Sequence, residues 1–497
     1  MFRGRTFRIA VTATAALLLA ACTHQSATFS SPEGTTPAAQ WGACQERYGV
    51  PNTTVECATI KVPADWDTPG GETLDLALVR TKSKSQKDRI GSLVINPGGP
   101  GGSGVDFAIY LAKSLPKEIL SRFDIVGFDP RGVGRSTPVE CIADGEKDAI
   151  NGYTPDPVEK GAFDGLVALQ KAAVDSCYQK YGDSLAHFAS VQAARDMDAI
   201  RTAVGDDKLS YLGFSYGTLL GSIYAQQNGQ NLRAAVLDGA VDPGESDVTS
   251  SEGQAAAFEK AFDAFAAWCK TNASTCGMGD DPRQYVMNLI ASVEARPPSG
   301  ANGRVATAGW VLTAVVAALY DEEAWPYLAA GLTQTAAGKP SLMFEMADNY
   351  VGRSGTGTYD NSTDAFSAVT CSDDATTETV DQVRAYQGEW RGKYPMFGAP
   401  LALSLLPCAL WRAPRTPYPT GASSGGPEIL VVGTTGDPAT PYVNAGKLAA
   451  QLGNAEVLTW EGEGHTAYPK TACVTAAVNG YLLELTTPPA GTVCPPK

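Results

Sequence analysis

The sequence predicts a protein of the α/β class, built on a mostly parallel central sheet that a block of helices interrupts. Strand-like and helix-like segments alternate from residue 40 to about 243. Helical patterns alone follow from about 244 to 405, and alternation resumes from about 425. The strand-like runs are continuously apolar, which suits parallel strands buried on both faces.

The expected elements divide the chain into an α/β core of 40–243 and 406–497, with a helical lid of 244–405 between its two parts. Strands are expected at 74–79, 92–96, 123–128, 209–212, 234–238, 429–433 and 456–459. Helices are expected at 193–204 in the core and at 255–270, 283–294, 308–320 and 322–337 in the lid. The lid enters directly after the strand that ends at Asp238.

The N-terminus predicts export from a bacterial cell. Three arginines precede an apolar run of 13 residues, Ile9 to Ala21, which is shorter than the ~20 residues that span a bilayer. This run ends in Leu-Ala-Ala-Cys and resembles a lipobox, whose cysteine is lipidated and becomes the first residue. We therefore expect 1–21 to be a signal peptide. Lipidated Cys22 and a Ser/Thr/Pro-rich tether (22–39) would hold the protein on the outer face of the cell membrane. An ordinary signal peptide with a nearby cleavage site is the alternative.

The charge and the cysteines narrow the function classes. A formal net charge of −15 argues against nucleic acid as a partner and against electrostatic binding to anionic lipid. We therefore expect contact with the membrane only through the lipid anchor. We also expect a monomer. Zinc-ligand spacing is absent, and we expect no metal and no cofactor. Excluding Cys22 leaves ten cysteines, an even number that suits disulfides in an oxidising compartment. Sequence alone does not fix their pairing, but chain order suggests Cys44–Cys57, Cys141–Cys177, Cys269–Cys276, Cys371–Cys408 and Cys473–Cys494.

The most informative motif is Gly213-Phe-Ser-Tyr-Gly217, which lies between a predicted strand and a predicted helix. A G-x-S-x-G in this context is the nucleophile elbow of the α/β-hydrolase fold, and it makes Ser215 the candidate nucleophile. The motif occurs a second time at 421–425, in a Pro/Ser/Gly-rich stretch that no strand precedes. We interpret that copy as linker.

The histidines select the rest of a catalytic triad. The chain has three: His24 lies in the tether, and His187 precedes the serine, whereas the order in this fold is Ser, acid, His. This leaves His465, in a glycine-rich turn after a strand, as the base. Asp437 follows the preceding strand and becomes the orienting acid; capping of the next helix is the alternative for it. Thr440, three residues after Asp437, could brace that carboxylate, but helix capping is the simpler explanation for it.

Acyl transfer also needs donors for an oxyanion. One is the backbone N–H of Tyr216, which follows the nucleophile. The glycine-rich stretch 96–104 directly follows an early strand and allows close approach of the backbone, and from it we favour the N–H of Gly99 as the second donor. A phosphate cradle is the alternative, but the lysine and the spacing of a P-loop are missing.

Three motifs together resemble the proline iminopeptidase-like α/β-hydrolases, and most closely the exported actinobacterial tripeptidyl aminopeptidases. They are Asn96-Pro-Gly-Gly-Pro-Gly101, Gly127-Phe-Asp-Pro-Arg-Gly132 and Gly213-Phe-Ser-Tyr-Gly217, and the resemblance covers about 40 to 490. It implies a TAP-like C-terminal segment that supplies Asp437 and His465. It also implies cleavage of short peptides from free N-termini beneath the lid. Pro97 stands where the iminopeptidases proper have histidine, which favours the tripeptidyl group.

An aminopeptidase needs an anion for the substrate's ammonium group. The lid offers Asp373 and Asp374 and, as a second acidic pair, residues 322 and 323; a solvated acidic turn is the alternative for them. Asp129 and Arg131 are expected to form a buried pair beside the site. The sequence therefore predicts a lipid-anchored serine exopeptidase that acts on peptides. An esterase or lipase with the same triad, and a binding lipoprotein with a relict fold, are the alternatives.

Overall fold

The computed structural model describes residues 37–46, 48–50, 53–300 and 303–497. Gly34–Lys497 form one compact unit, to which the following description refers. The predicted signal peptide, Cys22 and most of the tether lie outside the described residues. Within the described part of the chain, no helix combines the length and apolarity needed to cross a membrane.

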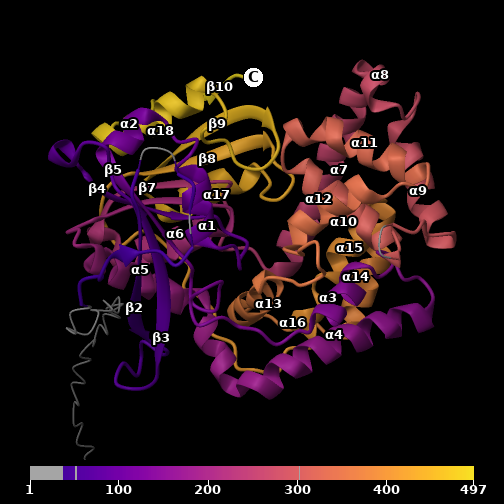
Figure 1. Cartoon of the computed structure of the whole chain (residues 1–497), viewed down its shortest axis with the longest axis horizontal. Coiled ribbons are helices and arrows are strands. Elements are labelled where there is room, and N and C mark those ends of the chain that lie inside the picture. Colours follow the sequence, from indigo (N-terminus) through magenta and orange to yellow (C-terminus); the bar gives the residue numbers. More distant parts are fainter. Residues whose placement is uncertain (1–36, 47, 51–52, 301–302) are drawn as a thin grey trace, which may run out of the picture. The chain divides into compact units, whose positions relative to one another are not determined.

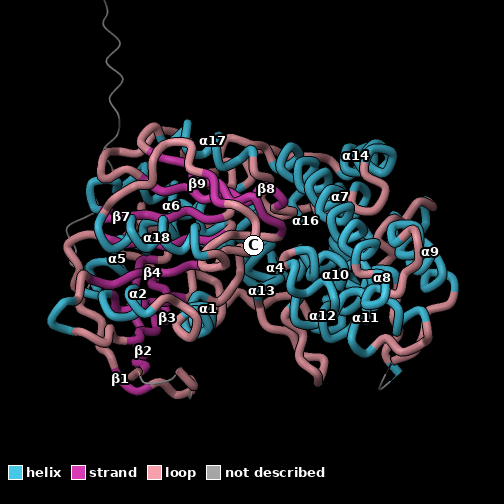
Figure 2. The backbone as a smooth tube through the Cα atoms, turned by 90° about the horizontal axis from the view of Figure 1, so that it is seen from above, coloured by secondary structure: helices cyan, strands magenta, loops and turns pink. Residues whose placement is uncertain are grey.

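A ten-stranded sheet forms the core, with the strand order β1-β2-β3-β5-β4-β6-β7-β8-β9-β10. The first three strands are antiparallel to their neighbours, and the strands from β5 to β10 in this order run parallel. Figure 2 shows the strands in magenta, side by side in the sheet. Their bounds are β1 Gly42–Ala43, β2 Val55–Pro63, β3 Thr73–Thr81, β4 Gly91–Asn96, β5 Phe123–Phe128, β6 Leu209–Phe214, β7 Leu232–Asp238, β8 Ile429–Gly436, β9 Ala455–Glu463 and β10 Val493–Cys494. This architecture is the α/β-hydrolase fold that the sequence predicts.

Helices cover both faces of the sheet, which explains the continuous apolar runs. All six residues of β4, of β5 and of β6 are buried. One apolar cluster joins the sheet to α5, α6 and α17, and another joins its opposite face to α1, α2 and α18. These helices span α1 Gly104–Leu111, α2 Lys117–Arg122, α5 Ser190–Val204, α6 Tyr216–Asn228, α17 Val443–Leu452 and α18 Ala472–Glu484.

A helical layer lies beside the sheet and has its own apolar core (Figure 1). Between β7 and β8 the chain forms α7 Asp247–Thr271, α8 Ala273–Cys276, α9 Pro282–Ala295, α10 Ala308–Leu319, α11 Trp325–Ala336, α12 Ser341–Val351, α13 Ser362–Asp373, α14 Val380–Lys393, α15 Gly398–Leu403 and α16 Leu406–Ala409. Short 3-10 turns occur at Gln86–Asp88, Gly182–Phe188, Gly229–Asn231 and Glu322–Ala324.

Two helices that precede Ser215 in the sequence also contact this layer. Besides α3 (Asp144–Asn151), the long helix α4 (Lys160–Tyr181) packs Phe163 and Leu166 into one apolar cluster with Trp390 and Leu406. The helical layer is therefore assembled from two separate stretches of chain, of which the 40–243 stretch supplies α3 and α4.

Five disulfides cross-link the unit, and they join the same five pairs that chain order suggests. They are Cys44–Cys57, Cys141–Cys177, Cys269–Cys276, Cys371–Cys408 and Cys473–Cys494. The pair Cys371–Cys408 links α13 to α16 within the helical layer.

The expected pair between Asp129 and Arg131 does not form, so that prediction is wrong. Arg131 is fully buried and pairs instead with Asp196 of α5 at 2.6 Å, where it also donates to three backbone carbonyls. Asp129 accepts hydrogen bonds from the hydroxyl of Ser103 and from the N–H groups of Val105 and Arg135. Each of the two buried charges thus has hydrogen-bond partners of its own, as burial requires.

Candidate active site

Ser215 lies on a sharp turn between β6 and α6. Its φ of +56° is unusual for a residue with a side chain, and backbone strain of this kind gathers at functional sites. The flanking glycines allow the turn, since a Cβ on Gly213 would lie 2.4 Å from the carbonyl oxygen of Gly217. The Ser215 side chain is partly exposed, and its N–H donates to the carbonyl oxygen of Asp238 at 2.9 Å.

The second G-x-S-x-G forms no such turn. It lies in the loop between α16 and β8, where the Ser423 hydroxyl donates to the carbonyl oxygens of Ala225 and Gly425 at 3.2 and 2.8 Å. Strand context therefore separates the two copies correctly.

The structure brings His465 and Asp437 together. Asp437 follows β8, His465 follows β9, and the imidazole Nδ1 lies 2.9 Å from both carboxylate oxygens. The carboxylate is buried and also accepts hydrogen bonds from the N–H groups of Ala439, Thr440 and Thr466. Acceptance by the carboxylate places the imidazole proton on Nδ1 and leaves Nε2 as an acceptor.

Thr440 bonds to the acid and does not cap a helix. Its hydroxyl donates to Asp437 at 2.9 Å and lies 3.3 Å from Nδ1 of His465. Helix α17 begins only at Val443, and no side chain caps it. The capping interpretation of Thr440 is therefore wrong, and so is that alternative for Asp437.

Ser215 and His465 lie at the same edge of the sheet, at the carboxyl ends of β6 and β9. The Nε2 atom of His465 is buried and has no hydrogen-bond partner among the described residues. The structure therefore contains no hydrogen bond between the Ser215 hydroxyl and His465.

The glycine-rich loop after β4 packs directly on the elbow. A Cβ on Gly98 would lie 2.9 Å from both the Cβ of Ser215 and the backbone nitrogen of Tyr216. The N–H of Gly98 donates to the Asn96 side chain at 2.9 Å, so it is already engaged. The N–H groups of Gly99 and Tyr216 have no acceptor among the described residues.

The two acidic residues expected to bind the ammonium group differ in their surroundings. Asp373, at the end of α13, accepts hydrogen bonds from the N–H and the hydroxyl of Ser190, and that hydroxyl also contacts the Tyr216 hydroxyl. Burial raises the pKa of Asp373 to about 7. Asp374 forms an ion pair with Arg415 instead. Of the second acidic pair, Glu323 is exposed and pairs with Lys497.

One acidic residue of this region was missed. Asp247 begins α7, is half-buried, and has no hydrogen-bond partner among the described residues. Burial, and next the nearby Asp374 carboxylate, raise the pKa of Asp247 to about 7. An aspartate in the first turn of a helix is so common that the sequence contains no signal for this arrangement.

The helical layer also touches the histidine turn. The carbonyl oxygen of Tyr320, which follows α10, accepts the His465 N–H at 2.8 Å. The Tyr320 ring meets the imidazole edge to face, with centroids 5.2 Å apart. Lys470 donates to the His465 carbonyl at 3.0 Å, which holds the turn from the other side.

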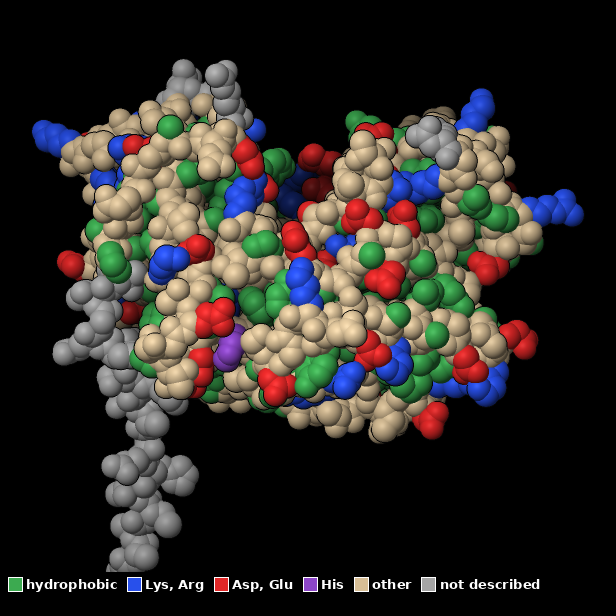
Figure 3. Space-filling view, turned by 60° about the horizontal axis from the view of Figure 1, so that its bottom comes forward, with side chains coloured by type: hydrophobic (Ala, Val, Ile, Leu, Met, Phe, Trp, Pro, Cys, Tyr) green, Lys and Arg blue, Asp and Glu red, His purple; other side chains and the backbone are tan. Residues whose placement is uncertain are grey.

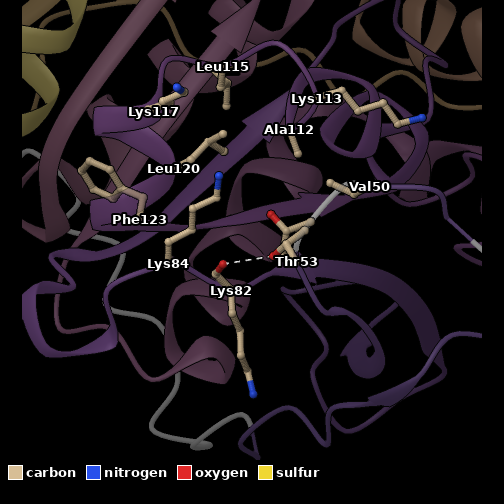
Figure 4. A pocket seen from close by; sticks show the side chains of 11 residues that line it. Val50, Thr53, Lys82, Lys84, Ala112, Lys113, Leu115, Lys117, Leu120 and Phe123 are labelled. Atoms are coloured by element: carbon tan, nitrogen blue, oxygen red, sulfur yellow. Dashed lines mark hydrogen bonds between the residues drawn. The ribbon is translucent and has the colours of Figure 1, made fainter.

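A cavity of about 210 Å³ lies elsewhere, at the opposite end of the sheet (Figure 4). It is lined by four lysines, Lys82, Lys84, Lys113 and Lys117, over an apolar floor that includes Phe123 at the start of β5. Since Ser215, Asp437 and His465 all follow the carboxyl ends of their strands, this cavity is remote from them.

Known proteins with similar sequences include serine hydrolases, in agreement with the α/β-hydrolase fold. A family model described as "TAP-like protein" matches residues 394–494, which contain Asp437 and His465. Serine protease Hip1 of Mycobacterium tuberculosis is 37% identical over 88% of this chain and 87% of that protein. Carboxylesterase B of the same species is 38% identical over 93% and 90%. Tripeptidyl aminopeptidase of Streptomyces lividans is 28% identical over 92% and 86%. The chain belongs to the TAP-like family of α/β-hydrolases.

Proposed function

We propose that this protein is a serine peptidase that works through an acyl-enzyme. The observation that carries the proposal is the pairing of His465 with Asp437 beside a strained Ser215 at one edge of the sheet. Two relatives bear the names serine protease and tripeptidyl aminopeptidase, which supports peptides as substrates.

The proposed mechanism follows from these positions. The Ser215 hydroxyl attacks the scissile carbonyl, while Nε2 of His465 takes its proton and then delivers it to the leaving amine. Asp437 keeps the imidazole in the required tautomer and stabilises its cation. The free N–H groups of Tyr216 and Gly99 bind the oxyanion, and water releases the acyl group in a second cycle.

The experiment is labelling with a fluorophosphonate, followed by mass spectrometry of the labelled peptide. We expect the label on Ser215, and we expect Ser215→Ala to abolish both labelling and peptide hydrolysis, with a loss of several orders of magnitude in kcat/KM. Ser423→Ala is the matched control, because it alters the same motif in a loop, and it should leave both unchanged. Activity retained by Ser215→Ala would refute the assignment.

We further propose that substrates are short peptides with a free N-terminus, released as tripeptides. Two acidic residues support this: neither Asp247 nor Asp373 forms an ion pair among the described residues, whereas Asp374 pairs with Arg415. Asp373 lies near Tyr216, because both contact the Ser190 hydroxyl, and Asp247 is close enough to Asp373 to raise its pKa. A substrate ammonium group would supply the missing counter-charge.

A tripeptidyl anilide with a free amine, compared with its acetylated form, tests this proposal. We expect the free amine to be required and Asp247→Asn to raise its KM at least about tenfold, as for a lost charged hydrogen bond. Asp381→Asn, which changes an exposed aspartate in the first turn of α14, is the control that should leave KM unchanged. Because the pKa of both carboxyls is raised to about 7, KM for the free amine should fall as pH rises through 7.

An esterase is the second candidate, favoured by the relative named carboxylesterase B. The same triad would serve it, and the difference lies in the substrate. Two results together would select this alternative. The wild type and Asp247→Asn would hydrolyse an uncharged ester at the same rate, and neither would hydrolyse the tripeptidyl anilide with a free amine.

Export with a lipid anchor at Cys22 is the remaining proposal. The five disulfides support an oxidising compartment outside the cytoplasm. We expect Cys22→Ala to move the protein from the membrane fraction to the medium, and intact mass spectrometry of the wild type to show acyl chains on the N-terminal cysteine. Membrane retention of Cys22→Ala would contradict the anchor.

A further inference from the structure

Asp238 is a buried carboxylate that the mechanism above does not use. It ends β7, between β6, which leads to Ser215, and β8, which leads to Asp437. Its exposure is 0%. An ionised carboxylate at such a position is costly unless hydrogen bonds compensate for the lost water.

The Asp238 side chain is bonded to the turn that carries His465. Both carboxylate oxygens lie 3.0 Å from the N–H of Ala467, and one accepts the N–H of Tyr468 at 2.8 Å. Ala467 and Tyr468 are themselves buried and follow His465 by two and three residues. The carboxylate therefore fixes the backbone directly after the imidazole.

The main chain of Asp238 is bonded to the nucleophile. Its carbonyl oxygen accepts the N–H of Ser215 at 2.9 Å. The next residue, Gly239, has a φ of +73°, and a Cβ there would lie 3.0 Å from Cε1 of His465. One short segment thus touches the serine turn on one side and the imidazole on the other.

We propose that Asp238 is a positioning residue that sets the separation of Ser215 and His465, by holding the serine turn through its carbonyl and the histidine turn through its carboxylate. The proposal rests on the serine-hydrolase function above. In that function His465 must reach the Ser215 hydroxyl, and a misplacement of about 1 Å costs about 100-fold in rate.

The ionisation of Asp238 supplies a pH readout. Burial raises the pKa of Asp238 to about 6, against the lowering effects of the N–H groups of Tyr468 and Ala467 and of the charges on His465 and Lys470. These two side chains, both from the turn after β9, are the titratable groups that face it. Protonation of one oxygen leaves only the other as an acceptor and removes the negative charge, so the hydrogen bonds that hold the histidine turn are weaker in acid.

Asp238→Asn is the test, because it places an amide donor against the same N–H groups without changing size. We expect kcat and the rate of fluorophosphonate labelling of Ser215 both to fall at least about tenfold, with KM little changed. The matched control is Asp124→Asn, a buried carboxylate at the start of β5 that accepts the Ser83 N–H at 2.8 Å. It should lower thermal stability without changing the labelling rate of the folded protein.

A second readout distinguishes positioning from stability. The readout is the rate of fluorophosphonate labelling, because an uncharged probe does not need the carboxyls proposed to bind an ammonium group. Below pH 6 the wild-type rate should fall more steeply than the rate of Asp238→Asn, in which this carboxyl cannot be protonated. Labelling of Asp238→Asn at the wild-type rate, or equally steep pH profiles of the two proteins, overturns the proposal. Where the variant does not fold, a wild-type labelling rate that stays constant between pH 7 and 5.5 also overturns it. Absence of labelling in the wild type would instead refute the serine-hydrolase function itself.

Discussion

At the scale of single residues, Thr440 contributes to the site through one hydroxyl. Its bond to Asp437 adds to three backbone N–H donors, so the acid is held rigidly while it holds the imidazole. We expect this hydroxyl to change the free energy of unfolding little, and to act by fixing the orientation of the Asp437 carboxylate. The contacts of Thr440 therefore match the bracing role that its sequence position allows, and not the helix cap that the sequence favours.

Thr440→Val removes this hydroxyl at nearly constant volume. We expect kcat to fall about three- to tenfold, which corresponds to the net ~0.5–1.5 kcal/mol of one hydrogen bond. Steady-state kinetics measure this, and Thr440→Ser should restore most of the activity because it restores the donor. Equal activity in the valine and serine variants would show that the hydroxyl has no part in the reaction.

Gly98 offers a second test at residue scale. Its φ is +93°, and a Cβ would clash at 2.5 Å with the carbonyl oxygen of Phe214 and at 2.9 Å with the Tyr216 nitrogen. Gly98→Ala should therefore displace the oxyanion donors and lower kcat about 100-fold, as the loss of one such donor does. Gly145→Ala, on an exposed helix with open space around it, is the control. Unchanged kcat in Gly98→Ala would remove this loop from the oxyanion site.

Candidate residues that lie in a motif, or that follow from chain order, could be predicted from the sequence. Partners that only folding brings together could not. Ser215 has a motif, and His465 and Asp437 follow from chain order. By contrast, Arg131 pairs with Asp196, 65 positions away, although Asp129 is its neighbour in the sequence. Asp238 and Asp247 carry no motif, since a carboxylate at a strand end or a helix start usually serves local structure.

At the scale of elements, α13 connects the helical layer with the site at two points. Near its start, the carbonyl oxygen of Ser362 approaches Gly101 of the glycine-rich loop, and at its end lies Asp373. The helix therefore borders the oxyanion loop and the acidic residues at once. We expect its placement to affect the fit of substrate more than the chemistry of Ser215.

Gly101→Ala tests this border. With a φ of +103°, a Cβ there would lie 2.5 Å from the Ser362 carbonyl oxygen, so α13 has to move outward. We expect KM for peptides to rise at least about threefold, while labelling by a small fluorophosphonate changes less, because only the peptide extends beneath α13. Kinetics on both probes measure the split, and parallel losses on the two would place the damage in the oxyanion loop instead.

The elements were predicted where their hydrophobic pattern is simple. The runs at 92–96 and 123–128 match β4 and β5, since a strand buried on both faces has no polar positions to obscure it. The packing of α4 with α14 and α16 is a long-range contact that no local pattern encodes.

At the scale of the whole molecule, buried carboxyls make stability depend on pH. Burial raises the pKa of Asp238 to about 6 and of Asp247 and Asp373 to about 7, from an ordinary 3.8. The folded protein therefore binds more protons than the unfolded chain between about pH 4 and 7, and the free energy of unfolding falls as pH rises through this window. The carboxyls whose pKa is lowered, such as Asp198, act only below this window.

We expect the midpoint of thermal unfolding to be lower at pH 8.5 than at pH 5.5 by roughly 5 °C, measured at constant ionic strength. The double variant Asp247→Asn/Asp373→Asn should reduce this difference, because it removes two of the titrating groups. A higher midpoint at pH 8.5 would contradict the sign. Acidic and basic side chains are interspersed on the face shown in Figure 3, and constant ionic strength keeps the screening of such charges equal at the two pH values.

The order of the disulfides has a consequence for how the chain matures. Each described cysteine pairs with the next one along the chain, and the five loops, with separations of 13, 36, 7, 37 and 21 residues, never interleave. A chain that is threaded outward from its N-terminus and oxidised as it emerges reaches this set without reshuffling. If neighbouring cysteines pair in the order in which they emerge, one additional free thiol before Cys44 would shift every pair by one position. Acylation of Cys22 would remove that thiol from the count, so we expect blocked acylation to scramble the disulfides, as peptide mapping without reduction would detect.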